Sequence, residues 1–439
     1  MSKRREQVSV HGLSCADILI PKKGVDMRRW AVVACDQYTS EPEYWQRVAQ
    51  TVGVAPSTLH MIYPEVYLEE ENPQQRIDAI NATMVRYLAE DLFDTYPDSF
   101  VLIERKTKEG KAGRWGLLAA LDLDEYDYSV DSTSLIRATE GTILERIPPR
   151  KAIRKNAALE VPHILVLIND AQKTVIEPLA AKVADLKALY ATTLMEGGGS
   201  ISAWLVNEQH LQDGVYVAID TLHSALDPAN PLLFAMGDGN HSLATAKSCW
   251  EDIKVSLSEA ERAHHPARFA LVEIENIHDV ALEFEPIHRT LFGLTQPAFE
   301  EEVGRVCASF EKERVDSLAA INALIDSSDA KQRFGYADES GYWVYTLNGA
   351  DHSIAAGSLQ SVIDSLLAKK RCTVDYIHGK EVTIKLGRKS GNIALILPEV
   401  SKATFFDTIV QDRALPRKTF SMGEAHEKRF YIEARKIRP

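Results

Sequence analysis

The sequence is poor in cysteine and contains no long apolar run. Only five of its 439 residues are cysteine, and no two of them form a Cys-x-x-Cys pair. This disfavours a disulfide framework and a cysteine zinc site. No apolar run reaches the ~18–20 residues that span a bilayer, and the polar residues 1–8 lack the apolar core of a signal peptide. We therefore expect a cytoplasmic protein that does not enter a membrane.

Positive charge is also scarce. The chain has 50 Lys and Arg against 63 Asp and Glu, which gives a formal net charge of −13. Its basic stretches, residues 27–30 and 413–418, are short. Nonspecific nucleic-acid binding needs clustered cations that neutralise phosphates. The composition therefore disfavours a nucleic-acid partner. We expect a small-molecule ligand, and the oligomeric state stays open.

Signatures of several common enzyme classes are missing. The sequence contains no Gly-x-x-x-x-Gly-Lys-Ser/Thr phosphate loop, no Gly-x-Ser-x-Gly nucleophile elbow and no His-Glu-x-x-His zinc motif. The standard P-loop, serine-hydrolase and zincin assignments therefore have no support. Any chemistry must come from a less common arrangement.

Apolar strands alternate with amphipathic helices along the chain. We predict strands over residues 29–36, 100–104, 115–121, 163–168, 215–220, 231–236 and 268–276, and helices over 42–50, 73–91, 171–190 and 243–252. This order predicts an α/β or α+β fold with a mixed sheet and flanking helices. We expect a main domain over residues 1–294 and a smaller α+β subdomain over 295–439, with a hairpin around Gly341, that completes the site.

The best candidate site is a turn of sequence Gly-Asp-Gly-Asn-His-Ser at positions 237–242. An apolar strand enters it, a helix leaves it, and its glycines permit a tight turn. The free N–H groups and positive dipole end of the helix make an anion site. Asp238 suits a metal contact, a hydroxyl contact or general-base work, and His241 can titrate near neutral pH. Alternatively, Asp238 merely caps the helix and His241 packs beside it.

Three other segments carry candidate groups. Arg137 and Glu140 lie in a charged passage that can clamp a ligand or can be a solvated turn. Asp36 follows a buried strand, where it can bind Mg²⁺ or activate a hydroxyl, or can form an Asx turn. His288 and Arg289 can stabilise developing negative charge or can belong to a surface turn.

Long motifs resemble a known family. The turn, extended as Gly-Asp-Gly-Asn-His-Ser-Leu-Ala-Thr-Ala-Lys from residue 237, resembles the signature of the family called domain of unknown function 1015 (DUF1015). The segments at residues 30–45, 136–149, 285–289 and 375–379 resemble it too, so the match covers most of the chain. The resemblance brings no established activity.

A second, distant resemblance implies a role for the turn. Many members of the family carry Asp-Gly-His-His-Arg there, which looks like the phosphate-binding turn of serine kinases in the ParB/sulfiredoxin-like superfamily. Asp238 and Gly239 match it, and His241 matches the second His, whereas Asn240 and Ser242 replace the first His and the Arg. The lost guanidinium was suited to bidentate phosphate contact. We expect Arg137 to replace it.

The resulting hypothesis is a nucleotide-dependent phosphotransferase that acts on a small metabolite hydroxyl and uses ATP or ADP with Mg²⁺. The expected catalytic residues are Asp238, Asn240, His241, Glu140 and Asp36. The expected nucleotide-binding residues are Gly237, Gly239, Ser242, Arg137, His288 and Arg289. Two alternatives remain: a non-catalytic nucleotide or metabolite sensor, and a hydrolase or lyase of a phosphorylated or carboxylated small molecule.

Overall fold

A computed structural model describes residues 9–107, 112–326 and 331–439. The chain forms two compact units: Met1–Leu282 together with Glu424–Pro439, and Glu283–Gly423. The expected boundary after residue 294 differs from this division, because strand β15 (Phe284–Phe292) pairs with strands of the second unit. The last residues return to the first unit, where β22 (Phe430–Tyr431) pairs with β4 (Val32–Val33) and β23 (Arg435–Lys436) pairs with β9 (Leu159–Glu160).

The first unit is built on a large mixed sheet, as the alternation of strands and helices predicts. Its parallel pairs are β10 (Leu165–Ile168) with β14 (Phe269–Asn276), β13 (Phe234–Asp238) with β8 (Ile136–Arg137), and β8 with β7 (Tyr126–Asp127). Its other pairs are antiparallel. Three strands near the N-terminus, β1 (Ser9–Val10), β2 (Leu13–Ser14) and β3 (Ala16–Pro21), add to it. The order across the sheet is β11 (Lys187–Thr193), β12 (Ser200–Val206), β5 (Phe93–Lys106), β6 (Arg114–Asp122), β14 (Phe269–Asn276), β10 (Leu165–Ile168), β13 (Phe234–Asp238), β8 (Ile136–Arg137) and β7 (Tyr126–Asp127).

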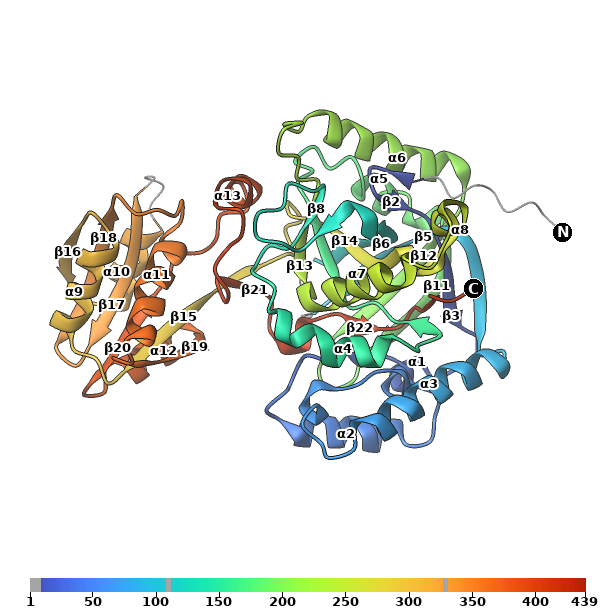
Figure 1. Ribbon diagram of the computed structural model, residues 1–439, viewed down its shortest axis with the longest axis horizontal. Coiled ribbons are helices and arrows are strands. Elements are labelled where there is room, and N and C mark those ends of the chain that lie inside the picture. Colours follow the sequence, from blue (N-terminus) through green and yellow to red (C-terminus); the bar gives the residue numbers. More distant parts are fainter. Residues whose placement is uncertain (1–8, 108–111, 327–330) are drawn as a thin grey trace. The chain divides into compact units, whose positions relative to one another are not determined.

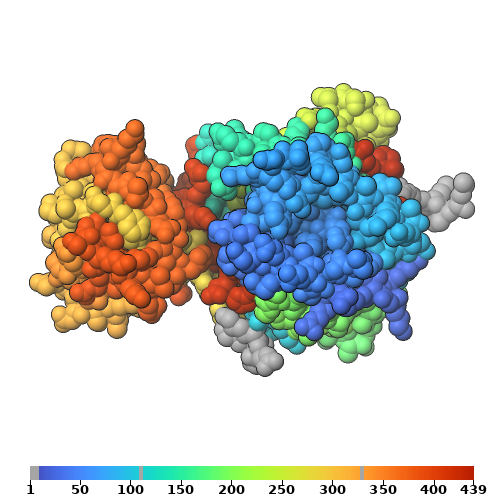
Figure 2. Space-filling model, turned by 90° about the horizontal axis from the view of Figure 1, so that it is seen from below, coloured from blue at the N-terminus to red at the C-terminus, as the bar shows by residue number. Residues whose placement is uncertain are grey.

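Each face of this sheet buries its own hydrophobic core. Val101 and Ile103 of β5 point to one core, and Leu102 between them points to the other, as the two-residue period of a strand requires. Helices α1 (Met27–Trp30), α2 (Pro42–Val52) and α3 (Pro73–Ala89) supply the first core, and α6 (Gln209–Ser224) and α7 (Asn240–Lys254) supply the second. In Figure 1, α6 lies at the top of the first unit and α2 and α3 at its bottom. In Figure 2, the residues coloured in shades of blue, from the N-terminal part of the chain, cover much of the first unit.

The remaining helices of the first unit are short. They are α4 (Ile147–Arg154), α5 (Glu177–Ala180) and α8 (Glu259–His264). Of these, α4 contacts α7. Among the described residues, no helix is both long enough and apolar enough to cross a membrane.

The second unit is an antiparallel sheet with helices on both faces. The order across the sheet is β16 (Ser309–Val315), β18 (Gly341–Asn348), β17 (Gln332–Asp338), β20 (Asn392–Ile396), β15 and β19 (Thr373–His378), and β21 (Phe420–Met422) also pairs with β15. Helices α9 (Gln296–Val306) and α11 (Ala355–Ala368) share one core, and α10 (Leu318–Ile325) and α12 (Lys380–Gly387) share another. Helix α13 (Phe405–Asp412) follows. The predicted hairpin around Gly341 is confirmed.

Two predicted elements are wrong, and the strand expected over residues 29–36 is reduced to β4, because residues 27–30 form α1. Residues 171–190 do not form one helix but contain the short α5, a 3-10 turn and most of β11. Residues 215–220 form part of α6 and not a strand. In that segment Val215 and Ile219 are buried and Val217 is 66% exposed. A helix also brings positions four residues apart to one face, so the spacing of Val215 and Ile219 fits a helix as well as a strand.

Candidate functional site

The turn between β13 and α7 has the predicted form. Strand β13 ends at Asp238, and Gly239, with φ +81°, is the N-cap of α7. Ser242 and Leu243 donate their N–H groups to the Gly239 oxygen at 2.9 and 3.1 Å, so the helix begins directly after the strand. A Cβ at Gly239 would lie 3.1 Å from the Cα of Ile164, so this position needs glycine for its φ and for its space. Gly237 lies within β13.

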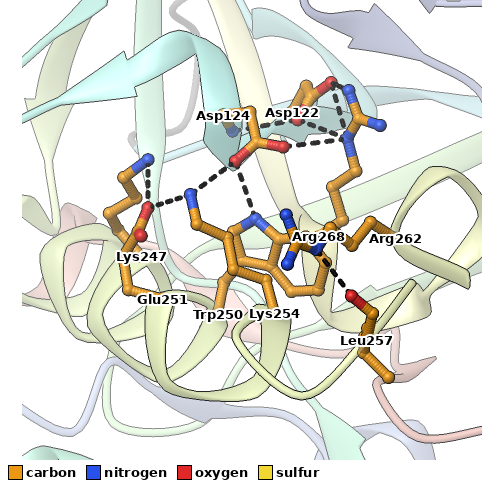
Figure 3. A network of polar contacts seen from close by, with 9 residues as sticks. All are labelled: Asp122, Asp124, Lys247, Trp250, Glu251, Lys254, Leu257, Arg262 and Arg268. Atoms are coloured by element: carbon orange, nitrogen blue, oxygen red, sulfur yellow. Dashed lines mark hydrogen bonds and ion pairs between the residues drawn. The ribbon is translucent and has the colours of Figure 1, made fainter. Parts of the chain in front are cut away.

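The opposite end of α7 is anchored by a network of polar contacts (Figure 3). The indole of Trp250, fully buried, donates to Asp124 at 2.8 Å, and Lys254 pairs with the same carboxylate at 3.2 Å. Arg268 binds Asp122 at 2.6 Å and Asp124 at 3.5 Å. Because these contacts hold the helix to the loop after β6, they also fix where its N-terminus points.

A lysine from the C-terminal segment lies at the turn. The ammonium nitrogen of Lys428 is 3.0 Å from Oδ2 of Asp238, whose Oδ1 accepts the Gly239 N–H at 2.8 Å. Burial by itself raises the pKa of Asp238, but the charge of Lys428, with smaller contributions from His163 and Gly239, holds that pKa below its usual value. Asp238 is therefore ionised at neutral pH. Sequence analysis missed Lys428, which stands two residues before β22.

A histidine that sequence analysis also missed links the turn to the C-terminal segment. The buried ring of His163 has Nε2 2.9 Å from Oγ of Ser242 and Nδ1 2.9 Å from the hydroxyl of Tyr431. The antiparallel pairing of β10 with β13, in which Leu165 faces Asp238, brings His163 to the turn. The available signal was a titratable ring at the start of the apolar segment 163–168.

A second acidic group lies near Asp36. The carboxylate of Asp36 accepts from the Gln37 side chain at 3.0 Å, and the N–H of Glu65 donates to the Cys35 oxygen at 2.8 Å. Glu65, in the 3-10 turn Glu65–Tyr67, is ion-paired with Arg150 of α4. Burial raises the pKa of Glu65, the charge of Arg150 only partly offsets this, and the charge of Asp36 raises it further. Asp36 and Glu65 therefore share one electrostatic environment.

The segment after β8 lies along the turn and carries Glu140. Thr139 donates its hydroxyl to the Met236 oxygen at 2.7 Å, and the Ile143 N–H donates to Nε2 of His241 at 3.2 Å. Glu140 lies in the chain between these two contacts, and its expected catalytic role stays a prediction. In the described part of the chain, the buried Oδ1 of Asn240 has no hydrogen-bond partner, so this atom is available to a ligand.

Arg137 does not face the turn. Its buried guanidinium donates to the backbone oxygens of Ser132 at 3.1 Å and Pro231 at 2.8 Å. Pro231 precedes β13, so these contacts hold the guanidinium at the beginning of that strand, whereas the turn is at its end. The expectation that Arg137 replaces the missing arginine is corrected, because strand pairing directs this side chain to the other end of β13.

His288 and Arg289 lie on β15 of the second unit. Nδ1 of His288 accepts the Leu397 N–H at 3.2 Å, and burial, with the charges of Lys380 and Arg289, lowers its pKa to about 3. Arg289 is fully buried, donates to the Ile287 oxygen and stacks on Tyr376 at 5.3 Å. The alternative that they belong to a surface turn is wrong, because both side chains are buried on a strand of the second unit. Their expected role in nucleotide binding stays a prediction.

A cavity of about 140 Å³ opens beside the first turn of α7. Its polar lining comes from Ser242, Thr245, His163 and Tyr431 and from the charged side chains Glu65, Arg150, Arg154 and Glu160, and most of the other lining residues are aliphatic. Among the described residues, no group of three or more His, Cys, Asp or Glu side chains is arranged to hold a metal ion. The site thus combines a helix N-terminus, an ion pair and a small chamber.

Comparison with curated proteins gives no match. Solved structures with similar chains include a free serine kinase variant in complex with ADP, which has 9% sequence identity and a TM-score of 0.40 over 73% of this chain and 92% of that chain. A conserved hypothetical protein from Pyrococcus furiosus has 9% identity and a TM-score of 0.35, with 73% and 95% covered. SbnI from Staphylococcus aureus, truncated at its C-terminus, has 10% identity and a TM-score of 0.33, with 72% and 82% covered.

A family profile described as "Protein of unknown function (DUF1015)" matches residues 19–366. The match spans the mixed sheet of the first unit, the turn before α7 and much of the second unit. It contains the turn and the segments at residues 30–45, 136–149 and 285–289 that first indicated the family, and it ends before residues 375–379. The chain belongs to the DUF1015 family.

Proposed function

We propose that this protein is a nucleotide-dependent phosphotransferase that acts on the hydroxyl group of a small molecule. The observation that carries the proposal is the Lys428–Asp238 ion pair at the N-terminus of α7. The first N–H groups of a helix have no partner within the helix and attract anions. Phosphoryl transfer needs mainly positioning and charge stabilisation, which amides and an ammonium group supply.

Lys428 supplies the positive charge that the turn lacks at Ser242. The ion pair with Asp238 holds Lys428 at the turn, and the lowered pKa of Asp238 keeps that carboxylate charged. An ionised carboxylate of low pKa is a poor proton acceptor but a good ligand for a hard cation. Asp238 would therefore position Lys428 and a Mg²⁺ ion that arrives with the nucleotide. Asp36 and Glu140 stay candidate Mg²⁺ ligands.

His163 is the better candidate for the proton acceptor. Its Nε2 lies 2.9 Å from the Ser242 hydroxyl, on the wall of the cavity. When Nδ1 carries the hydrogen and donates to Tyr431, the Nε2 lone pair accepts from Ser242. The carboxylate of Asp238 lies close enough to interact with the ring's charge and would stabilise the imidazolium that forms.

A ligand screen tests the proposal. Thermal unfolding is measured with ATP, ADP, CTP, GTP or inorganic phosphate, each with and without Mg²⁺, and nucleotides that bind are then assayed for turnover with a panel of alcohols and amino acids. We expect a nucleotide to raise the unfolding temperature, because a ligand of the folded state stabilises it by mass action. Absence of any nucleotide effect would refute the proposal. Binding without turnover would favour the sensor, and nucleotide hydrolysis that no acceptor accelerates would favour the hydrolase.

A further inference from the structure

We infer that the phosphoryl acceptor is a short, uncharged and largely apolar alcohol that binds in the cavity beside Ser242. This inference rests on the proposed phosphotransferase function and names its substrate class. It follows from the size of the cavity, the chemistry of its walls and the position of the Ser242–His163 contact.

The size of the cavity limits the acceptor. Its volume is about 140 Å³, close to the ~150 Å³ of an engineered apolar cavity that binds benzene. A body of about six or seven non-hydrogen atoms therefore fills it. A nucleotide is too large for this chamber, so phosphoryl donor and acceptor would occupy separate places that meet at the first turn of α7.

The walls are mainly hydrocarbon. Five of the aliphatic lining side chains come from separate elements or loops and are at least 94% buried: Met61, Ile62, Met84, Leu159 and Leu271. A sixth, Ile153 of α4, is half-buried. Each polyol hydroxyl placed against these walls would lose its hydrogen bonds to water without gaining a partner, which weakens binding. The lining therefore selects a compound whose body carries no further polar groups.

The charged groups of the wall neutralise each other. Arg154 and Glu160 line the cavity as one ion pair, with side chains 19% and 6% exposed. Glu65 and Arg150 line it as another, with side chains only 15% and 14% exposed. Arg150 also donates to the Arg146 backbone oxygen at 2.8 Å. A charged substrate would have to separate this pair, and breaking a buried pair is costly. An uncharged alcohol can bind beside this pair and leave it intact.

The hydroxyl end of the acceptor would face Ser242. The alcohol oxygen forms a bond to the terminal phosphorus of the nucleotide, and the bond from that phosphorus to the oxygen bridging to the leaving nucleotide breaks. The alcohol donates its proton to Oγ of Ser242, and Ser242 passes its own proton to Nε2 of His163, 2.9 Å away. The products are an alkyl phosphate, the shortened nucleotide and protonated His163, so atoms and charge balance.

Benzyl alcohol is the probe that tests this substrate class. Its binding to the full chain is measured by calorimetry, and its phosphorylation is compared with that of glycerol and of L-serine. We expect benzyl alcohol to bind and its kcat/KM to exceed both others by at least about tenfold, the lower range of discrimination by one buried contact. Preferred phosphorylation of glycerol or L-serine, or no binding of benzyl alcohol, would overturn the inference.

A matched pair of variants on α3 locates the binding. Met84→Trp fills the cavity, whereas Val85→Phe changes the neighbouring residue, which is 58% exposed. We expect Met84→Trp to raise the KM for benzyl alcohol by about tenfold or more and to leave nucleotide affinity unchanged, and Val85→Phe to change neither. Ile153→Phe serves the same purpose if Met84→Trp does not fold. Unchanged KM in both cavity variants would place the acceptor elsewhere.

The proton path and the underlying function are separated by further measurements. His163→Gln keeps a polar side chain at the Ser242 contact but removes the base, so kcat should fall while the KM for benzyl alcohol stays the same. An unchanged kcat would refute the proton path. If benzyl alcohol binds but no nucleotide does, the proposed function fails. If a nucleotide binds and another acceptor is phosphorylated better, only the substrate class fails.

Discussion

The ammonium group of Lys428 lies 3.0 Å from the carboxylate of Asp238, with side chains 11% and 24% exposed. The pair joins the C-terminal segment to the turn between β13 and α7. It places a cation beside the turn, and it keeps Asp238 ionised. The segment that holds Lys428 is itself fixed by the pairing of β22 with β4.

Replacing Lys428 should weaken nucleotide binding. We expect Lys428→Met to raise the nucleotide Kd by about ten- to a hundredfold, because a hydrogen bond to a charged group contributes about 1.5–3 kcal/mol. Calorimetric titration measures this Kd. The control is Lys436→Met, which removes an exposed lysine of the same segment and should leave affinity unchanged. Equal affinity in both variants would remove Lys428 from the site.

A glycine pair tests the geometry of the turn. Gly239→Ala should destabilise the first unit by at least about 1–2 kcal/mol, the cost of a left-handed L-residue, because φ is +81° and Ile164 is close. Gly214→Ala, in α6 with open space around the new Cβ, should stabilise by about 0.5–1 kcal/mol. Chemical denaturation measures both changes. Equal effects would contradict the described turn.

Acid should destabilise the second unit through His288. Its folded-state pKa, about 3, lies below the ordinary 6.5, so between these values the unfolded chain binds a proton that the folded chain does not. Stability is thus fully present above pH 6.5 and falls by about 1.4 kcal/mol for each pH unit below it. Denaturation monitored by a probe in this unit measures the slope. His288→Asn, whose amide oxygen can accept the Leu397 N–H as Nδ1 does, should flatten it. An unchanged slope would assign the effect to other groups.

Arg137 should matter for stability and not for ligand binding. Its guanidinium is buried and donates to backbone oxygens, so Arg137→Met should destabilise the first unit by about 1–3 kcal/mol, the cost of unsatisfied buried groups. Nucleotide Kd, measured well below the unfolding temperature, should stay within about twofold, since energies of separate sites add within ~0.5 kcal/mol. A selective loss of nucleotide affinity would restore the phosphate-binding role first expected of Arg137.

Local patterns predicted most elements and the turn itself. The apolar run before Gly237, followed by glycine, aspartate and a helical pattern, was sufficient to place β13 and α7, because chain reversal and helix start depend on neighbouring residues. The same local reasoning failed at residues 215–220, where Val215 and Ile219 satisfy both a strand period and a helix period. Local reasoning could not show toward which end of β13 the Arg137 side chain extends.

The sequence by itself determined the α/β class, the family and the strand–turn–helix at Asp238 and Gly239, since each of these depends on short-range order. Only the tertiary structure decided that His163 and Lys428 meet at that turn. His163 arrives through the pairing of β10 with β13, and Lys428 through the pairing of β22 with β4. Such contacts join residues far apart in the chain, and they form only when the buried faces of the sheet bring those strands together.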